Sequence, residues 1–504
     1  MGRKILIALL VNCLLWELVS AATDKVVCYH GSWSKYRSGN GQFTVNDIDP
    51  NLCTHLIYSF VGINTDGSIL LLDSTLDVNN ANFANFNALK TRNAALKTLV
   101  AVGGWGEGST KYSAVAASAT SRATFIQSAL NLVQTYGFDG FDIDWEYPAQ
   151  RGGAAADVQN YATLIKEFRT VFDKHGLLLT AAVAATPGSV DQSYDVPALS
   201  KYLDIINVMA YDIHASWDGV TGQNAPLYAS SIDTTASAKL LNVNASISGW
   251  ISRGADPQKL ALGLGVYGRS FTLSNSAISG LGAPVSGAGN SGPYTLEAGM
   301  LGYNEICEAQ LAGGWTTVWD DEQKVPYSFK GDQWIGYDNP RSIAIKASII
   351  LFIVNYAKSL NLGGVMIWSI ETEDFRGICG SKYPILNAIK SALGTANENI
   401  EENVNDDTGG NDDASSGGGT AVDDGNDTPV GDETVVDDGT ASGGTGGVTC
   451  TQAGYIRDPA DCNKFYYCLL VGSSYQPLAQ QCNSNLYFDL ESQTCNWPQL
   501  VSGC

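Results

Sequence analysis

Histidine and positive charge are scarce in this sequence, and each shortage argues against a class of site or partner. The 504 residues include four histidines, His30, His55, His175 and His214, and none of them stands at metal-ligand spacing. We therefore expect no histidine-based metal site. Lysine and arginine number 29 against 51 aspartates and glutamates, a formal net charge of −22. This acidity argues against nucleic acid and anionic membranes as partners.

Long apolar runs are scarce as well. One opens the sequence, "MGRKILIALLVNCLLWELVSAATDK", in which Arg3 and Lys4 precede an apolar stretch and then small residues. This order predicts a secretory signal peptide over residues 1–21. A membrane anchor is the alternative, but the run is short and Glu17 interrupts it. No other stretch is long enough to span a bilayer, so we expect a secreted, extracellular protein without a membrane partner.

Cysteine is present in a pattern that fits an oxidising compartment. Cys13 falls in the predicted signal peptide, which leaves ten cysteines, an even number that predicts disulfides. Four are spread over the first 380 residues, and six are concentrated between Cys450 and Cys504. The asymmetry predicts two different kinds of domain.

A third region lies between them, over residues 394–448. From Thr395 to Val448 the sequence has fourteen Asp or Glu, no Lys or Arg, and no aromatic residue. Such a segment cannot bury a core and its charges repel one another, so we predict a disordered acidic linker. Asn426 in the linker and Asn244 in the preceding region each begin an N-x-S/T sequon, which predicts glycosylation in a secreted protein.

The region 22–393 alternates short apolar runs with longer amphipathic stretches. Eight such runs read as buried strands, and eight parallel strands separated by helices close into an α/β barrel, the (β/α)₈ TIM fold. The gap between the seventh and eighth runs, about 269–340, is too long for one helix and contains further strand-like pieces. We expect a small α+β insertion there. The six cysteines after residue 449 predict a small disulfide-rich module over 449–504.

One run, "GFDGFDIDWEYP" at residues 137–148, carries four carboxylates in an apolar setting. Because side chains alternate along a strand, Asp142, Asp144 and Glu146 share one face. Three like charges this close cannot all ionise freely, so at least one should hold a proton near neutral pH, as a general acid must. Glu146 follows the others and should stand at the strand end, the rim that carries active sites in such barrels.

Other interpretations of these motifs fit less well. A calcium loop counted from Asp142 requires Gly at its sixth position and an acid at its twelfth, where this chain has Tyr147 and Gly153. A solvated acidic patch conflicts with the aromatic and branched neighbours. "GLGVYG" at residues 263–268 matches a dinucleotide-binding pattern, but no helix or acid follows at the required distance.

The segment "FDGFDIDWEYP" resembles the D-G-x-D-x-D-W-E signature of family 18 glycoside hydrolases, the chitinases. "KTLVAVGGW", "MAYDIHASWD", "YGRSFTL" and "GGVMIWSI" resemble the family motifs of the third, sixth, seventh and eighth strands. The resemblance implies an endo-type chitinase acting on chitin and chitooligosaccharides, without metal or organic cofactor, and we expect a monomer. A non-catalytic chitin-binding lectin or structural protein and an endo-N-acetylglucosaminidase are the alternatives; some relatives have lost the Glu at position 146, which this chain keeps.

The resemblance also implies roles for individual residues. Glu146 would be the general acid and base, and the N-acetyl group of the substrate would serve as nucleophile, with retention. Asp144 would orient that acetamide, Asp142 would share a proton with Asp144, and Tyr211 would donate a hydrogen bond to the acetamide carbonyl. Asp139 is out of phase with the other acids, and we expect it to support them from deeper in.

The remaining candidate residues are aromatic or polar side chains expected around the cleft, where rings stack on sugar faces. We expect Trp368 to form the floor beneath the scissile sugar. The full set of expected substrate-binding residues is Tyr29, Trp33, Phe60, Gly104, Trp105, Asp139, Tyr147, Met209, Asp212, Trp217, Tyr267, Arg269 and Trp368. Two departures from the family pattern, Ala101 in the third-strand motif and Glu371 and Glu373 after the eighth strand, leave the acid–base residues intact.

The C-terminal cysteine spacing, with "KFYYC" and "LYFDLESQTCNWP", resembles the peritrophin-A chitin-binding module, carbohydrate-binding family 14. Its candidates for sugar stacking, or else for its small core, are Tyr466, Tyr467, Tyr487, Phe488 and Trp497. In the barrel we expect the disulfides Cys28–Cys53 and Cys307–Cys379.

Overall fold

The computed structural model describes residues 25–351 and 362–393, and parts of the C-terminal region (454–459, 461–471, 474–482, 487–489, 494–496 and 501). The predicted signal peptide, the predicted linker and Asn426 lie outside the described residues. The chain divides into two compact units, residues 1–405 and 406–504. Among the described residues, no helix combines the length and apolarity needed to cross a bilayer.

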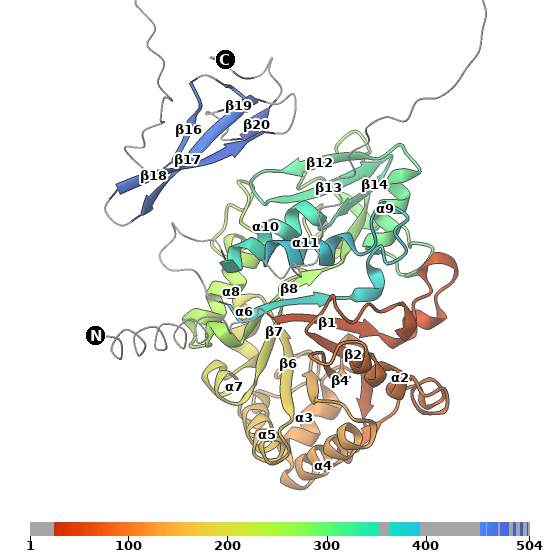
Figure 1. The fold of residues 1–504 in the computed structure, drawn as a ribbon. Coiled ribbons are helices and arrows are strands. Elements are labelled where there is room, and N and C mark those ends of the chain that lie inside the picture. Colours follow the sequence, from red (N-terminus) through yellow and green to blue (C-terminus); the bar gives the residue numbers. More distant parts are fainter. Residues whose placement is uncertain are drawn as a thin grey trace, which may run out of the picture. The chain divides into compact units, whose positions relative to one another are not determined.

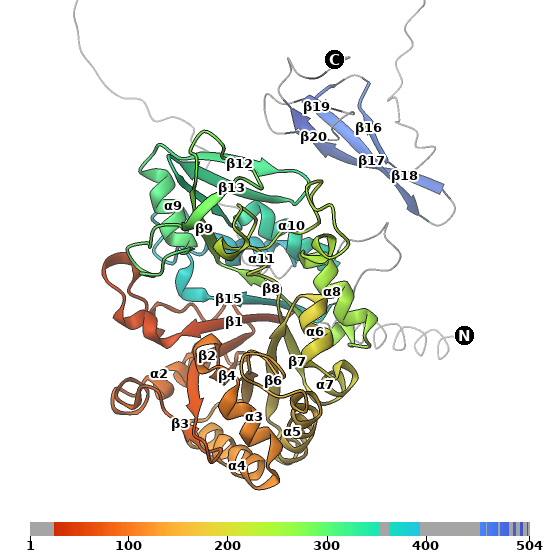
Figure 2. The ribbon, with the colours of Figure 1, turned by 180° about the vertical axis from the view of Figure 1, so that it is seen from behind.

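The first unit is built on eight parallel strands that close into a barrel. Strand β1 pairs with β2 on one side and with β15 on the other, so no barrel strand has an open edge; in Figures 1 and 2 β1 and β15 lie side by side. This confirms the predicted (β/α)₈ fold. The barrel strands are β1 (Lys25–Gly31), β2 (His55–Ile63), β4 (Lys97–Gly103), β5 (Gly140–Asp144), β6 (Leu178–Ala184), β7 (Ile205–Met209), β8 (Leu260–Gly265) and β15 (Gly364–Trp368); the short β3 (Ile69–Leu70) pairs antiparallel with β2.

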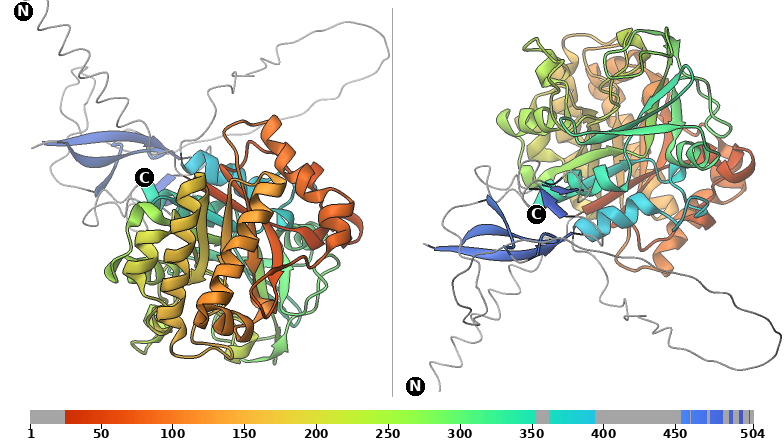
Figure 3. Two further views of the ribbon diagram at one scale, coloured as in Figure 1. Left: turned by 90° about the horizontal axis from the view of Figure 1, so that it is seen from below. Right: turned by 90° about the horizontal axis from the view of Figure 1, so that it is seen from above.

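Helices cover the outside of these strands. Helices α4 and α5 run side by side along the barrel wall, coloured orange to yellow in Figure 3. The helices around the barrel are α2 (Asn82–Ala88), α3 (Thr110–Ala117), α4 (Ala119–Tyr136), α5 (Asp157–Phe172), α6 (Pro187–Ser193), α7 (Val196–Tyr202), α8 (Val243–Ser252), α10 (Pro340–Leu351) and α11 (Pro384–Ala392).

Local sequence signals set where β5 begins. The Ser118 side chain caps the start of α4 by accepting a hydrogen bond from the Ser121 N–H at 3.2 Å. The helix ends at Gly137, whose φ of 75° places it in the left-handed conformation that favours glycine at a helix end. Three residues later β5 begins, so this turn sets the register of the acidic strand.

Between β8 and β15 the chain forms a second sheet with one helix. Its strands are β9 (Tyr267–Leu273), β10 (Val285–Ala288), β11 (Met300–Gly302), β12 (Thr316–Asp320), β13 (Val325–Lys330) and β14 (Gln333–Gly336), and its helix is α9 (Tyr303–Leu311). Trp334 and Phe271 form its own apolar core, with ring centroids 5.3 Å apart. In Figure 1 this sheet carries the green β12, β13 and β14.

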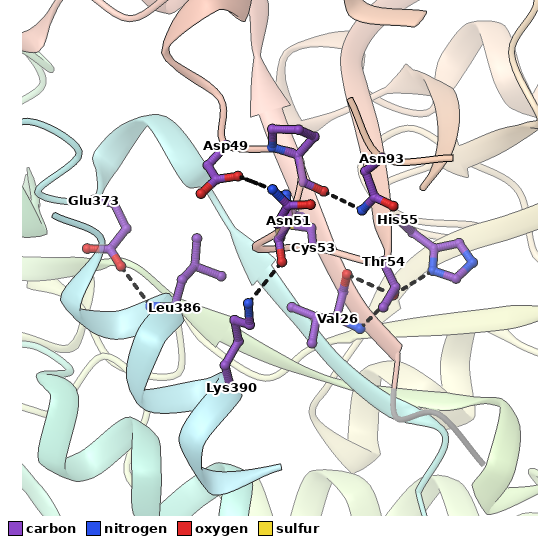
Figure 4. The surroundings of a disulfide bond; sticks show 12 residues. Val26, Asp49, Asn51, Cys53, Thr54, His55, Asn93, Glu373, Leu386 and Lys390 are labelled. Atoms are coloured by element: carbon purple, nitrogen blue, oxygen red, sulfur yellow. Dashed lines mark hydrogen bonds between the residues drawn. A yellow bond between two sulfur atoms is a disulfide. The ribbon is translucent and has the colours of Figure 1, made fainter. Parts of the chain in front are cut away.

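Two disulfides of the first unit are Cys28–Cys53 and Cys307–Cys379, the pairs named from the sequence. The first joins β1 to the segment before β2, and Figure 4 shows its surroundings. There the Thr54 hydroxyl bonds both the N–H and the carbonyl of Val26. Lys390 of α11 donates to the Asn51 carbonyl at 3.0 Å, so this helix is tied to the same corner of the barrel.

The second unit is a small β module. Strands β16 (Gly454–Arg457), β17 (Lys464–Val471) and β18 (Ser474–Gln481) form an antiparallel sheet, and β19 (Tyr487–Asp489) pairs with β20 (Thr494–Asn496). Cys462 and Cys482 are disulfide-bonded. This agrees with the disulfide-rich β module expected from the cysteine spacing.

Candidate active site

The acids of β5 and the loop after it divide between two environments. Asp142 is fully buried inside the barrel, where it accepts hydrogen bonds from the hydroxyls of Tyr29 (2.8 Å) and Thr180. These donors come from β1 and β6, on other sides of the barrel. Phe141, the next residue back, faces outward and stacks on Phe168 of α5 with 5.8 Å between ring centroids. The alternation of a strand thus separates the acids from the apolar side chains that anchor it.

Asp144 and Glu146 stand further along, at the carboxyl end of the strand. Asp144 is 4% exposed, and its Oδ1 atom has no hydrogen-bond partner among the residues that the structure describes. A buried carboxylate oxygen without a donor is costly unless a ligand supplies one. Both residues line a cleft of about 550 Å³ at this end of the barrel. Asp144 is therefore prepared to accept a hydrogen bond from a bound molecule.

Burial shifts the pKa values of all three acids upward. It raises the pKa of Asp142 to about 6 against the hydrogen bonds from Thr180, Tyr29 and Asn207. Burial first, and then the charges of Glu146 and Asp142, raise the pKa of Asp144 well above its ordinary value. Burial raises the pKa of Glu146 to about 7, although a hydrogen bond from Tyr147 and the charge of Arg151 oppose it. The cluster therefore holds protons near neutral pH, as general-acid chemistry requires.

Aromatic rings form most of the apolar lining of the cleft. Trp368, at the end of β15, lies 5.6 Å from Tyr29, 5.7 Å from Phe60 and 6.2 Å from Trp33 between ring centroids. Trp33 is 42% exposed, Trp105 63% and Trp217 65%, although all three line the cleft. Exposed indole rings around a concave site offer flat apolar faces, which suits a sugar polymer.

Polar residues from two segments line the same cleft. The Asp212 carboxylate accepts hydrogen bonds from the Tyr267 hydroxyl (2.6 Å) and from Arg269 Nε (2.7 Å) on the same oxygen, Oδ1. Tyr211 beside it is 9% exposed, and its hydroxyl lies 3.7 Å from the sulfur of Met366. Asp212 and Tyr211 follow β7, whereas Tyr267 and Arg269 belong to β9 of the inserted sheet. The site thus depends on the insertion as well as on the barrel.

Most of the residues predicted from the sequence line this one cleft. Gly104 lies directly behind it, because a Cβ atom there would stand 2.6 Å from the ring of Phe60. Asp142 lies beneath the cleft rather than in its wall. The predicted residues in the wall are Tyr29, Trp33, Phe60, Trp105, Asp144, Glu146, Tyr147, Met209, Tyr211, Asp212, Trp217, Tyr267, Arg269 and Trp368.

The structure places Asp139 outside the cleft wall. This residue lies before β5, at the end of the strand away from the cleft, and it is absent from the cleft wall. Its carboxylate accepts hydrogen bonds from Lys90 Nζ and from the Thr98 N–H, each at 2.9 Å. Burial opposes its ionisation, but these donors lower the pKa of Asp139 overall. Among the described residues, the Asp139 carboxylate pairs with Lys90 and Thr98, at the strand end away from the cleft.

Several residues at the cleft are not among those predicted from the sequence. Eight further residues line the cleft, namely Arg37, Ala182, Thr295, Glu297, Met300, Ser369, Glu371 and Thr372. Arg151 was not predicted either. Its guanidinium lies 3.4 Å above the centroid of the Trp105 ring and donates to the carbonyls of Glu146 (2.9 Å) and Trp105 (3.0 Å). In the sequence, Glu371 and Glu373 stand out only as departures from a family motif. No pattern around Arg151 indicates that it lies at the site.

The remaining candidates are Asn244 and the aromatic residues of the C-terminal module. Asn244 is exposed at the start of α8, a position open to modification. In the C-terminal module the Tyr466 hydroxyl donates to Asp458 at 2.7 Å, and Tyr487 is partly buried on β19. The side chains of Tyr467 and Phe488, and the whole of Trp497, lie outside the described residues, so their roles stay predictions.

Comparison with known proteins identifies the family. The model of the glycosyl hydrolases family 18 matches residues 25–373. The chain belongs to this family. A second model, the chitin binding Peritrophin-A domain, matches residues 450–504.

Relatives and solved structures agree with this family 18 assignment. An endochitinase of Manduca sexta is 40% identical over 398 residues, covering 77% of this chain and 70% of the relative. Chitotriosidase-1 of Mus musculus is 40% identical over 389 residues, covering 74% and 79%. The crystal structure of an Ostrinia furnacalis Group IV chitinase in complex with allosamidin has a TM-score of 0.71 and 48% identity, and covers 74% of this chain and 99% of that one.

Proposed function

We propose that this protein is a chitinase that hydrolyses the β-1,4 bonds between N-acetylglucosamine units of chitin, with Glu146 as general acid and base. The enzyme class follows from family membership and from the chitinase relatives. The observation that carries the assignment of roles is the Asp144 Oδ1 atom, unpartnered among the described residues, in the same aromatic cleft as Glu146, whose pKa burial raises to about 7.

The proposed reaction needs no protein nucleophile. Glu146 donates its proton to the leaving glycosidic oxygen while the N-acetyl oxygen of the same sugar attacks C1, which gives an oxazolinium ion. Asp144 accepts the acetamide N–H on its free oxygen and balances the positive charge that develops. Water then attacks C1 from the side of the departed group, returns a proton to Glu146, and leaves the configuration retained.

The neighbouring groups support these two acids. Asp142 is held by Tyr29 and Thr180 beneath the cleft. There it shares one proton with Asp144. The Tyr211 hydroxyl is bonded only weakly, to the sulfur of Met366, and is available to the acetamide carbonyl. Trp368 and its aromatic neighbours stack on the sugar at the bond that is cleaved.

The C-terminal module fits an insoluble substrate. Residues 450–504 match a chitin-binding domain, and a binding module on a tether raises the local concentration of the barrel at the polymer surface. Chitin lies outside cells, so we infer that the protein is secreted and that residues 1–21 are its signal peptide. We also infer that it acts as a monomer, since one chain supplies every residue named in the site.

Hydrolysis of a chitin tetramer by the native chain and by Glu146→Gln tests the proposal. We expect product from the native chain and at least a thousandfold lower kcat in the variant, the order of magnitude that general acid–base catalysis contributes. Tetramer binding without turnover by the native chain would favour a lectin. Release of glycans from a glycoprotein, but no cleavage of the tetramer, would favour an endo-N-acetylglucosaminidase.

A further inference from the structure

Asp212 stands in a backbone conformation that needs support. Its φ of 56° lies in the left-handed region, which costs a residue with a Cβ atom free energy unless its surroundings hold it there. Its side chain is 37% exposed in the cleft wall, so the carboxylate has room to swing away. Its placement therefore depends on whatever fixes its backbone.

Asn224 fixes that backbone from beneath. This residue is fully buried, and its Oδ1 atom accepts a hydrogen bond from the Asp212 N–H at 2.9 Å. Its own carbonyl accepts a hydrogen bond from the Ile213 N–H, also at 2.9 Å. Asn224 thus bonds the peptide groups on both sides of the Asp212 Cα atom.

The same side chain reaches the other half of the site. Asn224 Nδ2 donates to the Tyr267 carbonyl at 3.1 Å, and the Tyr267 hydroxyl in turn donates to the Asp212 carboxylate. Asn224, Tyr267 and Asp212 therefore form a closed ring of hydrogen bonds. One buried amide joins the segment after β7 to the first strand of the insertion.

The space around Asn224 is matched to its side chain. A Cβ atom on Gly265 would lie 3.1 Å from Asn224 Nδ2 and 3.4 Å from the Cβ of Tyr211, so glycine at 265 leaves room for the amide. The next residue is anchored as well, because the buried Lys346 donates to the Ala225 carbonyl at 2.6 Å while paired with Asp338. Asn224 therefore has a rigid base from which to act.

We propose that Asn224 is a positioning residue, which holds Asp212 and Tyr267 in the arrangement that the cleft presents to the sugar chain. This inference rests on the proposed chitinase function. Asn224 itself touches no substrate and acts through Asp212.

The test compares two buried asparagines that make the same kind of contact. Asn242 also accepts one backbone N–H (Ala245, 2.8 Å) and donates to one carbonyl (Lys239, 2.9 Å), but it caps α8 away from the cleft. We expect Asn224→Leu to lower kcat/KM for a chitin tetramer about 30-fold, mainly through kcat, and Asn242→Leu to leave it within about twofold, while both lower the melting temperature. Asn224→Asp, which keeps the acceptor for Asp212, should fall between wild type and Asn224→Leu.

A double-mutant cycle separates positioning from general destabilisation. In an Asp212→Asn background, Asn224→Leu should lower kcat/KM less than about threefold, because residue 212 no longer carries the charge that Asn224 positions. The inference would be overturned if the effects of Asp212→Asn and Asn224→Leu on kcat/KM multiplied in the double variant. It would also be overturned if the leucine variants at positions 224 and 242 lost activity equally.

A readout without substrate keeps this result apart from the proposed function. In a crystal structure of Asn224→Leu, Asp212 should leave its left-handed conformation and lose its bond to Tyr267. An unchanged Asp212 would refute the positioning role even in an active enzyme. Failure of the native chain to cleave the tetramer would instead refute the chitinase proposal, and the structure of the variant would still decide the role of Asn224.

Discussion

The two ends of β5 carry the same kind of side chain in opposite electrostatic states. At the amino-terminal end, Asp139 meets Lys90 and the Thr98 N–H, and the pKa of its carboxyl is lowered. At the carboxyl-terminal end, Asp144 is buried beside Asp142 and Glu146, and the pKa of its carboxyl is raised. The two aspartates are five positions apart in the sequence. Because both residues are aspartates, their surroundings account for the opposite pKa shifts.

The largest expected effect is at the carboxyl end. Asp144→Asn keeps the size of the side chain but removes the charge that would balance the developing cation, so we expect kcat for a chitin tetramer to fall by about two to three orders of magnitude. Tetramer binding should change much less. A fall below tenfold would show that Asp144 is not part of the chemistry, and the comparison between the two ends would fail.

The next effect lies deeper in the strand. Asp142→Asn keeps one of the two oxygens that accept from Tyr29 and Thr180 and cannot share a proton with Asp144, so we expect kcat to fall about tenfold to a hundredfold. The melting temperature should change little, because removal of a buried charge offsets the lost acceptor. Steady-state kinetics with a thermal melt checks both, and unchanged kcat would contradict the proton-sharing role.

Arg151 offers a subtler test of the raised pKa values. Its charge lowers the pKa of Glu146, which stands at about 7. A general acid must be protonated, so activity should be lost as the pH rises through this pKa. Arg151→Gln should raise the pKa and move the alkaline limb of the pH–kcat profile to higher pH. As a control, Arg253→Gln changes an arginine paired with Asp191 and should leave the limb in place; a downward shift in Arg151→Gln would be the contrary result.

The smallest effect on activity is expected at the amino end. Asp139→Asn should leave kcat/KM within about twofold and lower the free energy of unfolding by about 1 kcal/mol near neutral pH. Because the pKa of Asp139 is lower in the folded protein, its stabilisation is present above the unfolded pKa of about 3.9 and is lost as the pH falls through the folded value. Urea unfolding of both proteins at pH 7 and pH 3 measures this difference in the free energy of unfolding. A loss of turnover in Asp139→Asn would show instead that Asp139 contributes to the reaction.

The fold was predictable because eight apolar runs of strand length recur between amphipathic stretches, a pattern that a closed parallel barrel satisfies. The acids were predictable because a period of two places Asp142, Asp144 and Glu146 on one face. The same reasoning could not identify the partners of Asp139, because periodicity indicates a face but not the strand end at which the pairing lysine lies.

Other parts of the site could not be predicted from pattern at all. Asn224 lies in the long irregular segment between β7 and α8, where no periodicity links it to Asp212 or Tyr267. Arg151 reaches Trp105 across 46 positions of sequence through a loop of its own. The closed barrel brings these irregular segments together. The periodicity of a single sequence does not predict contacts between such segments.

Closure of the barrel between β1 and β15 has a consequence for biosynthesis. The last barrel strand begins about 330 residues after the first one ends, which at 5–20 residues per second means roughly 20 to 60 seconds of translation. Throughout that interval one edge of β1 has no partner of its own chain, and a bare edge is a template for pairing with other chains. The nascent polypeptide therefore exposes this edge until β15 emerges, and truncations upstream of Gly364 should accumulate as aggregates rather than as smaller folded domains.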